Sequence, residues 1–355
     1  MPSPETIKQA LKTEANHLGF VLFGCSQPFV SADFERFEAW IQNGFGKGMP
    51  YLSRPEAHLA RKDPNLLLPG IHTVISLAIP YPLLDSEEPT QETSDYGRLA
   101  SYACLEDYHV SLKNLAVRLA SNLEFWTPGS KTLVCVDTAP ILEKAYAQQA
   151  GLGWIGQNTL LFNPEFGSRL LLAEILTTLE LPMDQSISGD PCIDCGLCLE
   201  ACPTGALVGN RNMDSNRCLS FLTIENRIEI PIQFRQNVGN RVFGCDACQL
   251  ACPYNQTLLP AELLLPLSKH HSPAIDLQSE LGLNPDEFKT RYAGTPILRA
   301  KHNGFIRNLI LAAGNSGNPG FLPQLQALQG TVTESMLQET LDWAIRALEI
   351  PNSAN

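Results

Sequence analysis

The pattern of hydrophobic and polar residues divides the chain into three parts. In residues 1–188, segments with helical spacing alternate with apolar runs typical of strands, which we predict at 73–79, 132–136 and 169–176. The first predicted helix has apolar residues on one face, at Ile7, Leu11, Ala15 and Leu18. This alternation predicts an α/β domain over residues 1–188.

Residues 189–257 and 258–355 have different patterns. In the middle part, proline and glycine interrupt short segments, which is typical of loops held together by a metal. From residue 258 onward, apolar residues return at helical spacing, at Ile306, Ile310 and Ala313 and again from Leu337 to Leu348. Consecutive helices joined by short turns predict a C-terminal stack of helical hairpins, of the HEAT-like repeat type.

Composition narrows the class of protein. The 355 residues are 44% hydrophobic and 17% charged, which fits a folded chain. No uninterrupted apolar run reaches the ~20 residues that a membrane-spanning helix needs, and lysines and glutamates replace the apolar core of a signal peptide. We therefore expect a cytoplasmic protein that does not bind membranes. The net charge of -12 disfavours a general binder of polyanions.

Cysteine is the most informative residue type. The chain has 11 cysteines, and in a reducing compartment metal ligation or redox chemistry is the expected use. Cys192, Cys195, Cys198 and Cys202 form the spacing C-x2-C-x2-C-x3-C-P, in which three thiolates bind one 4Fe-4S cluster and the fourth binds a second. The spacing predicts a ferredoxin-like domain with two clusters over residues 189–257.

The second cysteine run is incomplete. Val242 stands where its leading cysteine is expected, and Cys218 is the remaining cysteine of this block. Including Cys218 gives eight ligands, which we assign by the crossover rule to one cluster on Cys192, Cys195, Cys198 and Cys252 and another on Cys202, Cys218, Cys245 and Cys248. The alternative is a pair of zinc sites, but a triple C-x2-C-x2-C is not a zinc spacing. Two adjacent clusters indicate an electron path that ends in the first domain.

A glycine motif at Gly151, Gly153 and Gly156 matches the dinucleotide-binding fingerprint G-x-G-x-x-G. That fingerprint requires a strand before it and a helix after it. Here the order is reversed, because residues 140–150 have a helical pattern and Gly151 is a helix stop. We therefore predict no Rossmann-type site, although the loop could let a planar cofactor approach the backbone.

Three stretches together carry a resemblance to a known family. They are residues 61–70 (RKDPNLLLPG), 102–109 (YACLEDYH) and 137–161, which begins DTAPILEKAYAQQAGLGWIGQN and precedes the cysteine runs. Together with the cysteine arrangement and the helical tail, the resemblance extends over nearly the whole chain, which is identified as a member of the epoxyqueuosine reductase family. The resemblance implies a cobalamin-dependent enzyme with two 4Fe-4S clusters that reduces epoxyqueuosine in tRNA to queuosine. The N-terminal α/β domain would then bind the cobalamin.

The resemblance also implies site residues. Asp137 matches the proton donor of the family, and Cys104 falls near the cysteine beside the cobalamin. The other expected cobalamin contacts, by position, are Arg61, Gly153, Gln157 and Asn158. No D-x-H-x-x-G sequence is present, so the chain offers no evident histidine ligand for cobalt.

The residues themselves leave alternatives open for these roles. Asp137 follows the apolar run 133–136 and would need burial and a raised pKa to act as an acid, but it could instead cap the following helix. Cys104 could be functional or simply a small buried residue, and His109 could be a core histidine.

Five basic residues predict a tRNA surface. They lie within nineteen residues that contain no aspartate or glutamate, and they are Lys289, Arg291, Arg299, Lys301 and Arg307. The alternative is an ordinary solvated helical face. Tyr292 and Phe305 could stack on bases or could fill a helical core.

The expected partners are tRNA carrying epoxyqueuosine, bound at its anticodon stem-loop, and an external low-potential electron donor, and we expect a monomer. Two other functions compete with tRNA modification: a reductive dehalogenase and a ferredoxin-like electron carrier. The missing export signal and the basic helical tail disfavour the first, and the large N-terminal domain disfavours the second.

Overall fold

An antiparallel sheet forms the centre of the N-terminal part in the computed structural model, which describes residues 2–29, 31–84, 95–189, 191–192, 194–256, 267 and 271–349. The strand order is β1-β2-β7-β4, and the strands are β1 (Leu22–Ser26), β2 (Thr73–Pro80), β4 (Thr132–Cys135) and β7 (Leu170–Thr177). The three predicted strands are therefore confirmed. The sheet is not a parallel α/β sheet, because every neighbouring pair runs in opposite directions, as in Ile75 opposite Ile175.

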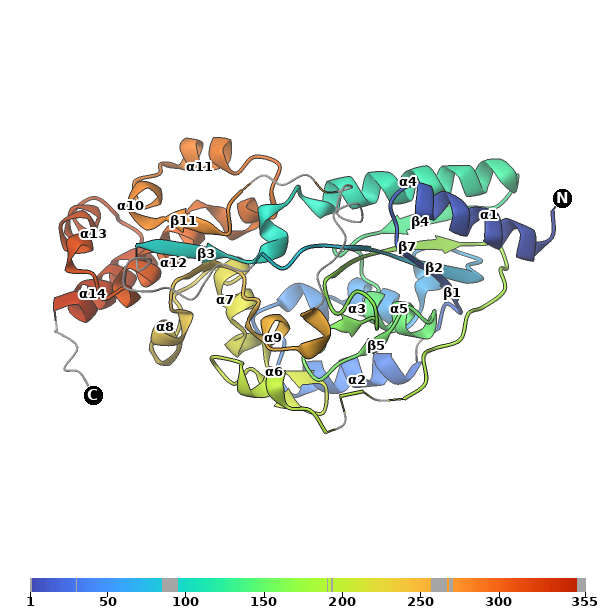
Figure 1. Cartoon of the computed structure of the whole chain (residues 1–355), viewed down its shortest axis with the longest axis horizontal. Helices are drawn as coiled ribbons and strands as arrows, with labels where there is room; N and C mark the ends of the chain where they lie inside the picture. Colours follow the sequence, from blue (N-terminus) through green and yellow to red (C-terminus); the bar gives the residue numbers. More distant parts are fainter. Residues whose placement is uncertain are drawn as a thin grey trace.

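Helices cover both faces of this sheet (Figure 1). α1 (Pro4–His17) and α4 (Tyr108–Trp126) pack on one face against residues such as Ile75 and Ile175. On the other face, α5 (Glu143–Gln149) packs against Val74 and Leu176. All eight residues of β2 are buried, as expected for a strand with neighbours on both sides. In Figure 1, α2 (Ser31–Gln42) lies below α5, and α3 (Pro55–Lys62) lies beside it.

The glycine motif lies between a helix and a hairpin. α5 ends before Gly151, whose φ of 76° is one that glycine adopts without strain. The hairpin of β5 (Trp154–Ile155) and β6 (Leu161–Phe162) follows. The order of helix, glycines and hairpin is the reverse of the order that the dinucleotide fingerprint requires, as the sequence predicts.

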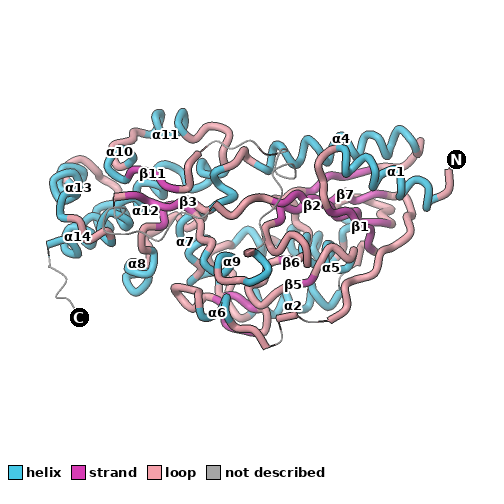
Figure 2. Tube along the Cα trace, in the orientation of Figure 1, coloured by secondary structure: helices cyan, strands magenta, loops and turns pink. Residues whose placement is uncertain are grey.

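The middle part is mostly loop, as Figure 2 shows around α6 and α9. Its elements are α6 (Leu197–Glu200), β8 (Leu207–Gly209), β9 (Asn212–Met213), α7 (Leu219–Ile224), α8 (Ile232–Val238), β10 (Arg241–Phe243) and α9 (Ala247–Leu250). The two short helices α6 and α9 pack against each other and carry cysteines at their starts.

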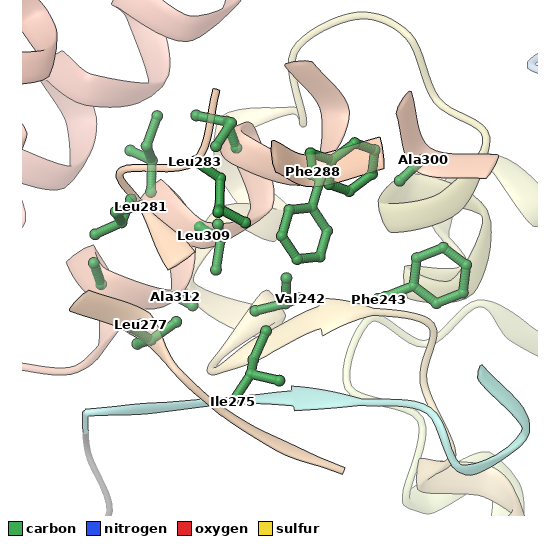
Figure 3. Close-up of a cluster of buried hydrophobic side chains, with 14 of the residues drawn as sticks. Val242, Phe243, Ile275, Leu277, Leu281, Leu283, Phe288, Ala300, Leu309 and Ala312 are labelled. Carbon is green, nitrogen blue, oxygen red and sulfur yellow. The ribbon is translucent and has the colours of Figure 1, made fainter. Parts of the chain in front are cut away.

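A second sheet crosses the predicted domain boundaries. β3 (Tyr96–Leu99) pairs with β10 in parallel and with β11 (Ala274–Asp276) in antiparallel fashion. Side chains from β10, β11 and the C-terminal helices share one core (Figure 3), and Leu99 and Cys104 belong to the same core. The segment around β3 therefore packs with the C-terminal half, and the boundary at residue 188 does not separate independent cores.

The C-terminal helices pack around α12 (Lys301–Asn315). The others are α10 (Leu277–Glu280), α11 (Pro285–Arg291), α13 (Leu322–Gln329) and α14 (Ser335–Glu349). Residues 304–314 of α12 are all buried, because α14, α8 and β10 surround it. Helices are thus confirmed in both places where the periodicity predicts them. No helix in the described ranges is long and apolar enough to span a bilayer.

Candidate active site and cluster-binding region

The first group of cysteines surrounds a small cavity. Cys192, Cys195, Cys198 and Cys252 line this cavity of about 210 Å³. Burial, and then the charges of the other three thiols, raise the pKa of Cys198 to about 11. Four thiols that destabilise each other's charge in this way fit a site in which a positively charged group holds them together.

The second group lies beside the first. Burial, followed by the charges of Cys245 and Cys218, raises the pKa of Cys248, and Cys198 of the first group adds to this effect. After burial, the charges of Cys245 and Cys202 raise the pKa of Cys218, so Cys202 lies with this second group. The cysteines thus lie in the two groups that the crossover rule assigns, and the groups are neighbours.

Buried polar contacts fix the cysteine loops to the N-terminal sheet region. Asn255 Oδ1 accepts from the backbone N–H of Ser168 at 2.8 Å, and Gln249 donates to the Ser168 carbonyl at 3.1 Å. Gly167 has a φ of 63°, and a Cβ there would lie 2.1 Å from Asn255 Oδ1. The loops and the sheet region therefore meet in close contact.

A larger cavity of about 720 Å³ lies where all three parts of the chain meet. Its apolar wall includes Phe37, Trp40, Leu142 and Met213, and its charged residues include Arg36, Arg61, Asp137, Glu143, Arg211, Glu225 and Arg299. This combination of apolar surface and cations suits a large amphipathic ligand with anionic groups.

Asp137 is the centre of a charged cluster on this wall. Its Oδ2 lies 2.8 Å from His109 Nε2 and 3.6 Å from Arg299 Nη1. Its backbone N–H donates to the Glu143 carboxylate, and its φ is 51°, which is rare for a residue with a side chain. The cap of α5 is Leu142, without a side-chain hydrogen bond, so the alternative that Asp137 caps this helix is wrong.

The protonation states in this cluster differ from the expectation. Burial raises the pKa of Asp137, but the hydrogen bond and charge of His109 and the charge of Arg299 outweigh it, so the pKa lies below its usual value. Burial lowers the pKa of His109, but hydrogen bonds to Asp107 and Asp137 raise it overall to about 9. Asp137 is therefore ionised at neutral pH and does not have the raised pKa that a proton donor was expected to need.

Among the residues in contact with Asp137, Glu143 has a carboxyl group whose pKa is raised. Burial, and then the neighbouring Asp137 charge, raise the pKa of Glu143 to about 8. Neither Glu143 nor Glu225 was among the predicted residues. Glu143 lies within the family-like stretch 137–161, but nothing in that stretch marks it as a cavity residue, and Glu225 reaches the cavity only through the fold.

The other predicted cofactor contacts lie in different places. Arg61 lines the large cavity, with its guanidinium 5.4 Å from the Phe37 ring centroid. Gln157 and Asn158 line the small cavity beside the cysteines instead. Gly153 is needed in the hairpin, because a Cβ there would lie 1.8 Å from the Phe162 carbonyl oxygen.

Cys104 lies in the shared core of the C-terminal half. It is completely buried, and its Sγ lies 3.7 Å from the Ala100 carbonyl oxygen. It is not among the residues that line the large cavity. The structure therefore agrees with the alternative interpretation, in which Cys104 is a small buried residue of the core.

The five basic residues do not form one surface. Arg307 is completely buried and donates to the carbonyls of Leu222, Asn226 and Ile228, so its assignment to tRNA is wrong. Arg299 points into the large cavity. Tyr292 and Phe305 are buried in the core and cannot stack on bases. Three basic residues remain. Lys289 forms an ion pair with Asp286, Arg291 forms one with Glu280, and Lys301 is exposed.

Comparisons with known proteins agree with the cysteine pattern. Residues 191–255 match the model of a 4Fe-4S double cluster binding domain, and residues 61–138 match that of epoxyqueuosine reductase QueG, DUF1730. The chain therefore has a domain for two 4Fe-4S clusters, not a pair of zinc sites.

The similar solved structures extend over almost the whole chain. One is the epoxyqueuosine reductase of Streptococcus thermophilus, with 27% identity, a TM-score of 0.85 and coverage of 98% of this chain and 92% of that one. That of Bacillus subtilis, with its catalytic aspartate loop swung out of the active site, has 28% identity, a TM-score of 0.87 and coverage of 97% and 90%. An epoxyqueuosine reductase bound to an epoxyqueuosine-modified tRNA-Tyr stem loop has 25% identity, a TM-score of 0.82 and coverage of 97% and 99%.

Curated relatives have higher sequence identity. The epoxyqueuosine reductase of Pseudomonas aeruginosa is 34% identical over 349 residues, which is 97% of this chain and 95% of the relative. That of Escherichia coli is 34% identical over 343 residues, which is 96% of this chain and 89% of the relative. Similarity at this level along the full length, together with the cluster domain and the charged cavity, shows that the chain belongs to the epoxyqueuosine reductase family.

Proposed function

We propose that this chain reduces the epoxide of epoxyqueuosine in tRNA to the alkene of queuosine, with cobalamin in the large cavity. The observation that carries the proposal is the group of charged side chains around Asp137. It lies on the wall of a cavity that also borders the region predicted to bind the 4Fe-4S clusters. Similarity to epoxyqueuosine reductases over 97% of the chain disfavours a dehalogenase or a simple electron carrier.

The residues of the cavity fit cobalamin in chemical character. The apolar wall would contact the macrocycle, and Arg36, Arg61 and Arg211 would bind its polar and anionic groups. When bound, cobalamin supplies the electrons to the epoxide carbon, and the two 4Fe-4S clusters connect it to an external low-potential donor.

The chain itself must manage the protons. Opening the epoxide and releasing its oxygen as water consumes two electrons and two protons. Asp137, half-exposed to the cavity at 42%, would pass a proton to the departing oxygen. The low pKa of Asp137 requires that another group hold this proton before the reaction.

The tRNA would bind near the C-terminal helices. Lys301, Arg227 and His302 line a separate cavity of about 650 Å³ at the start of α12, and Lys289 is 70% exposed nearby in the sequence. Phosphate groups favour such lysines and arginines, so Lys289, Arg291 and Lys301 remain our candidates for the stem-loop surface.

The test is Asp137→Asn, which keeps the size of the side chain but removes the group that transfers the proton. Conversion of epoxyqueuosine in a tRNA stem-loop, measured by mass spectrometry under excess reductant, should fall by about 100-fold or more. Iron content and cobalamin binding should stay unchanged, and Asp342→Asn, at an exposed aspartate of α14, serves as the matched control. Wild-type conversion by Asp137→Asn would contradict the proposal for this residue.

A further inference from the structure

The Asp137 cluster contains a histidine with two competing partners on one nitrogen. His109 Nδ1 lies 2.6 Å from Asp107 Oδ1, and because a carboxylate only accepts, Nδ1 carries a hydrogen. Nε2 lies 2.8 Å from Asp137 Oδ2 and 2.5 Å from Arg299 Nη1. A protonated Nε2 donates to Asp137, whereas an unprotonated Nε2 accepts from Arg299.

We propose that His109 stores the proton that Asp137 delivers to the substrate oxygen, and that Arg299 promotes its release. This inference rests on the proposed function. The Nε2–H bond of His109 breaks as an O–H bond forms on Asp137 Oδ2, and Asp137 then gives the proton to the oxygen that leaves the carbon. An N–H of Arg299 donates to the vacated nitrogen and stabilises the neutral imidazole.

The electrons and the second proton have separate sources. The two electrons come from the external low-potential donor through the clusters. The second proton enters from water by protonation of His109 or Asp137, since the Asp137 side chain is 42% exposed. The leaving oxygen departs as water, so two electrons and two protons balance the step.

The surroundings of His109 support this assignment. Its side chain is 14% exposed, and the charge of Arg299 lowers the pKa of His109, which the two aspartates raise. The titratable and charged groups that face the imidazole and its partners include Asp107, Asp137, Arg299, Tyr108, Tyr102, Tyr51, Glu143 and Glu225.

Arg299 reaches the cavity from the C-terminal part of the chain. It belongs to the 3-10 turn Pro296–Ala300, where Arg227 donates to the carbonyls of Arg299 at 2.7 Å and Ala300 at 3.1 Å. Glu225 Oε1 lies 3.7 Å from Arg299 Nη2. The proton-donating site is therefore complete only when the C-terminal part is docked.

The experiment compares Arg299→Gln, Arg299→Lys and the control Arg346→Gln, which removes an exposed arginine of α14 that lines neither the large cavity nor the candidate tRNA surface. Single-turnover conversion of a stem-loop is measured from pH 6 to 10 with saturating RNA, alongside the stem-loop Kd. Without Arg299 the imidazolium is a weaker acid, so Arg299→Gln should slow conversion by about 10-fold or more. The alkaline limb of the pH–rate profile of Arg299→Gln should move to higher pH. The Kd of this variant for the stem-loop should change less than about twofold. Arg299→Lys should lie between Arg299→Gln and the wild type.

Two results would overturn the inference. One is an Arg299→Gln enzyme with wild-type rate and pH profile. The other is weakened stem-loop binding with an unchanged rate at saturation, which would make Arg299 a tRNA contact. Should the wild-type enzyme not convert the stem-loop, the proposed function fails, and NMR titration of His109 decides the inference separately. An upward shift of the His109 pKa in Arg299→Gln supports it, and an unchanged pKa overturns it.

Discussion

Glu143 shows how the cavity wall changes the chemistry of a single side chain. Its carboxylate accepts the backbone N–H of Asp137, and burial raises its pKa to about 8 from the ordinary 4.5. The folded chain therefore binds this proton more tightly than the unfolded chain. The resulting contribution to stability is complete below pH 4.5 and is lost as the pH rises through about 8.

We predict that Glu143→Gln stabilises the protein increasingly as the pH rises. The amide oxygen can still accept the Asp137 N–H but carries no charge to bury. Thermal unfolding should give the same Tm as the wild type near pH 4.5 and a Tm higher by roughly 2–5 °C at pH 9. The control is the exposed Glu165→Gln, and a Tm difference that does not depend on pH would contradict the prediction.

At the scale of elements, short helices that begin beside cysteines organise the cluster domain. Cys218 precedes α7, and Cys248 lies on α9, so both are placed by one helical turn. The cysteine spacing predicted the ligands within loops, and the structure adds the short helices that start beside them. Cys218 stands apart from both cysteine runs, so it was assigned as a ligand only because two clusters need eight cysteines.

Replacing Cys218 with alanine should remove the cluster that it shares with Cys202, Cys245 and Cys248. Iron content should fall from about eight to about four atoms per chain, with loss of one component of the reduced EPR spectrum. Cys25→Ala, which removes a buried thiol of β1, should keep all the iron. Full iron and an unchanged EPR spectrum in Cys218→Ala would show that the ligand assignment is wrong.

α12 illustrates what an element gains from its surroundings. Its sequence contains Arg307, which in isolation resembles a phosphate ligand. Because α12 is buried, this arginine instead donates to the carbonyl of Leu222 in α7 and to those of Asn226 and Ile228 after it, where unpaired oxygens would be costly. The basic residues 289–307 therefore do not form the single surface that their spacing predicted, because the packing of α12 buries Arg307.

At the scale of the molecule, we predict that Lys289→Glu with Lys301→Glu weakens stem-loop binding and leaves both clusters in place. Binding measured at several salt concentrations should give a shallower slope, because each lost phosphate contact releases about one fewer counterion. Lys12→Glu with Lys47→Glu makes the same charge change in the N-terminal part and serves as control. Equal affinity and slope in both double variants would place the tRNA surface elsewhere.

The sequence by itself determined the features that depend on near neighbours in the chain. Strand and helix periodicity, the helix stop at Gly151 and the C-x2-C spacing are local, because backbone geometry and ligand reach span only a few residues. The family resemblance identified Asp137, but only the tertiary structure brought it into contact with His109 and Arg299. The same folding buried Cys104 and Arg307 and lowered the pKa of Asp137, because burial and charge pairing depend on residues that are distant in sequence.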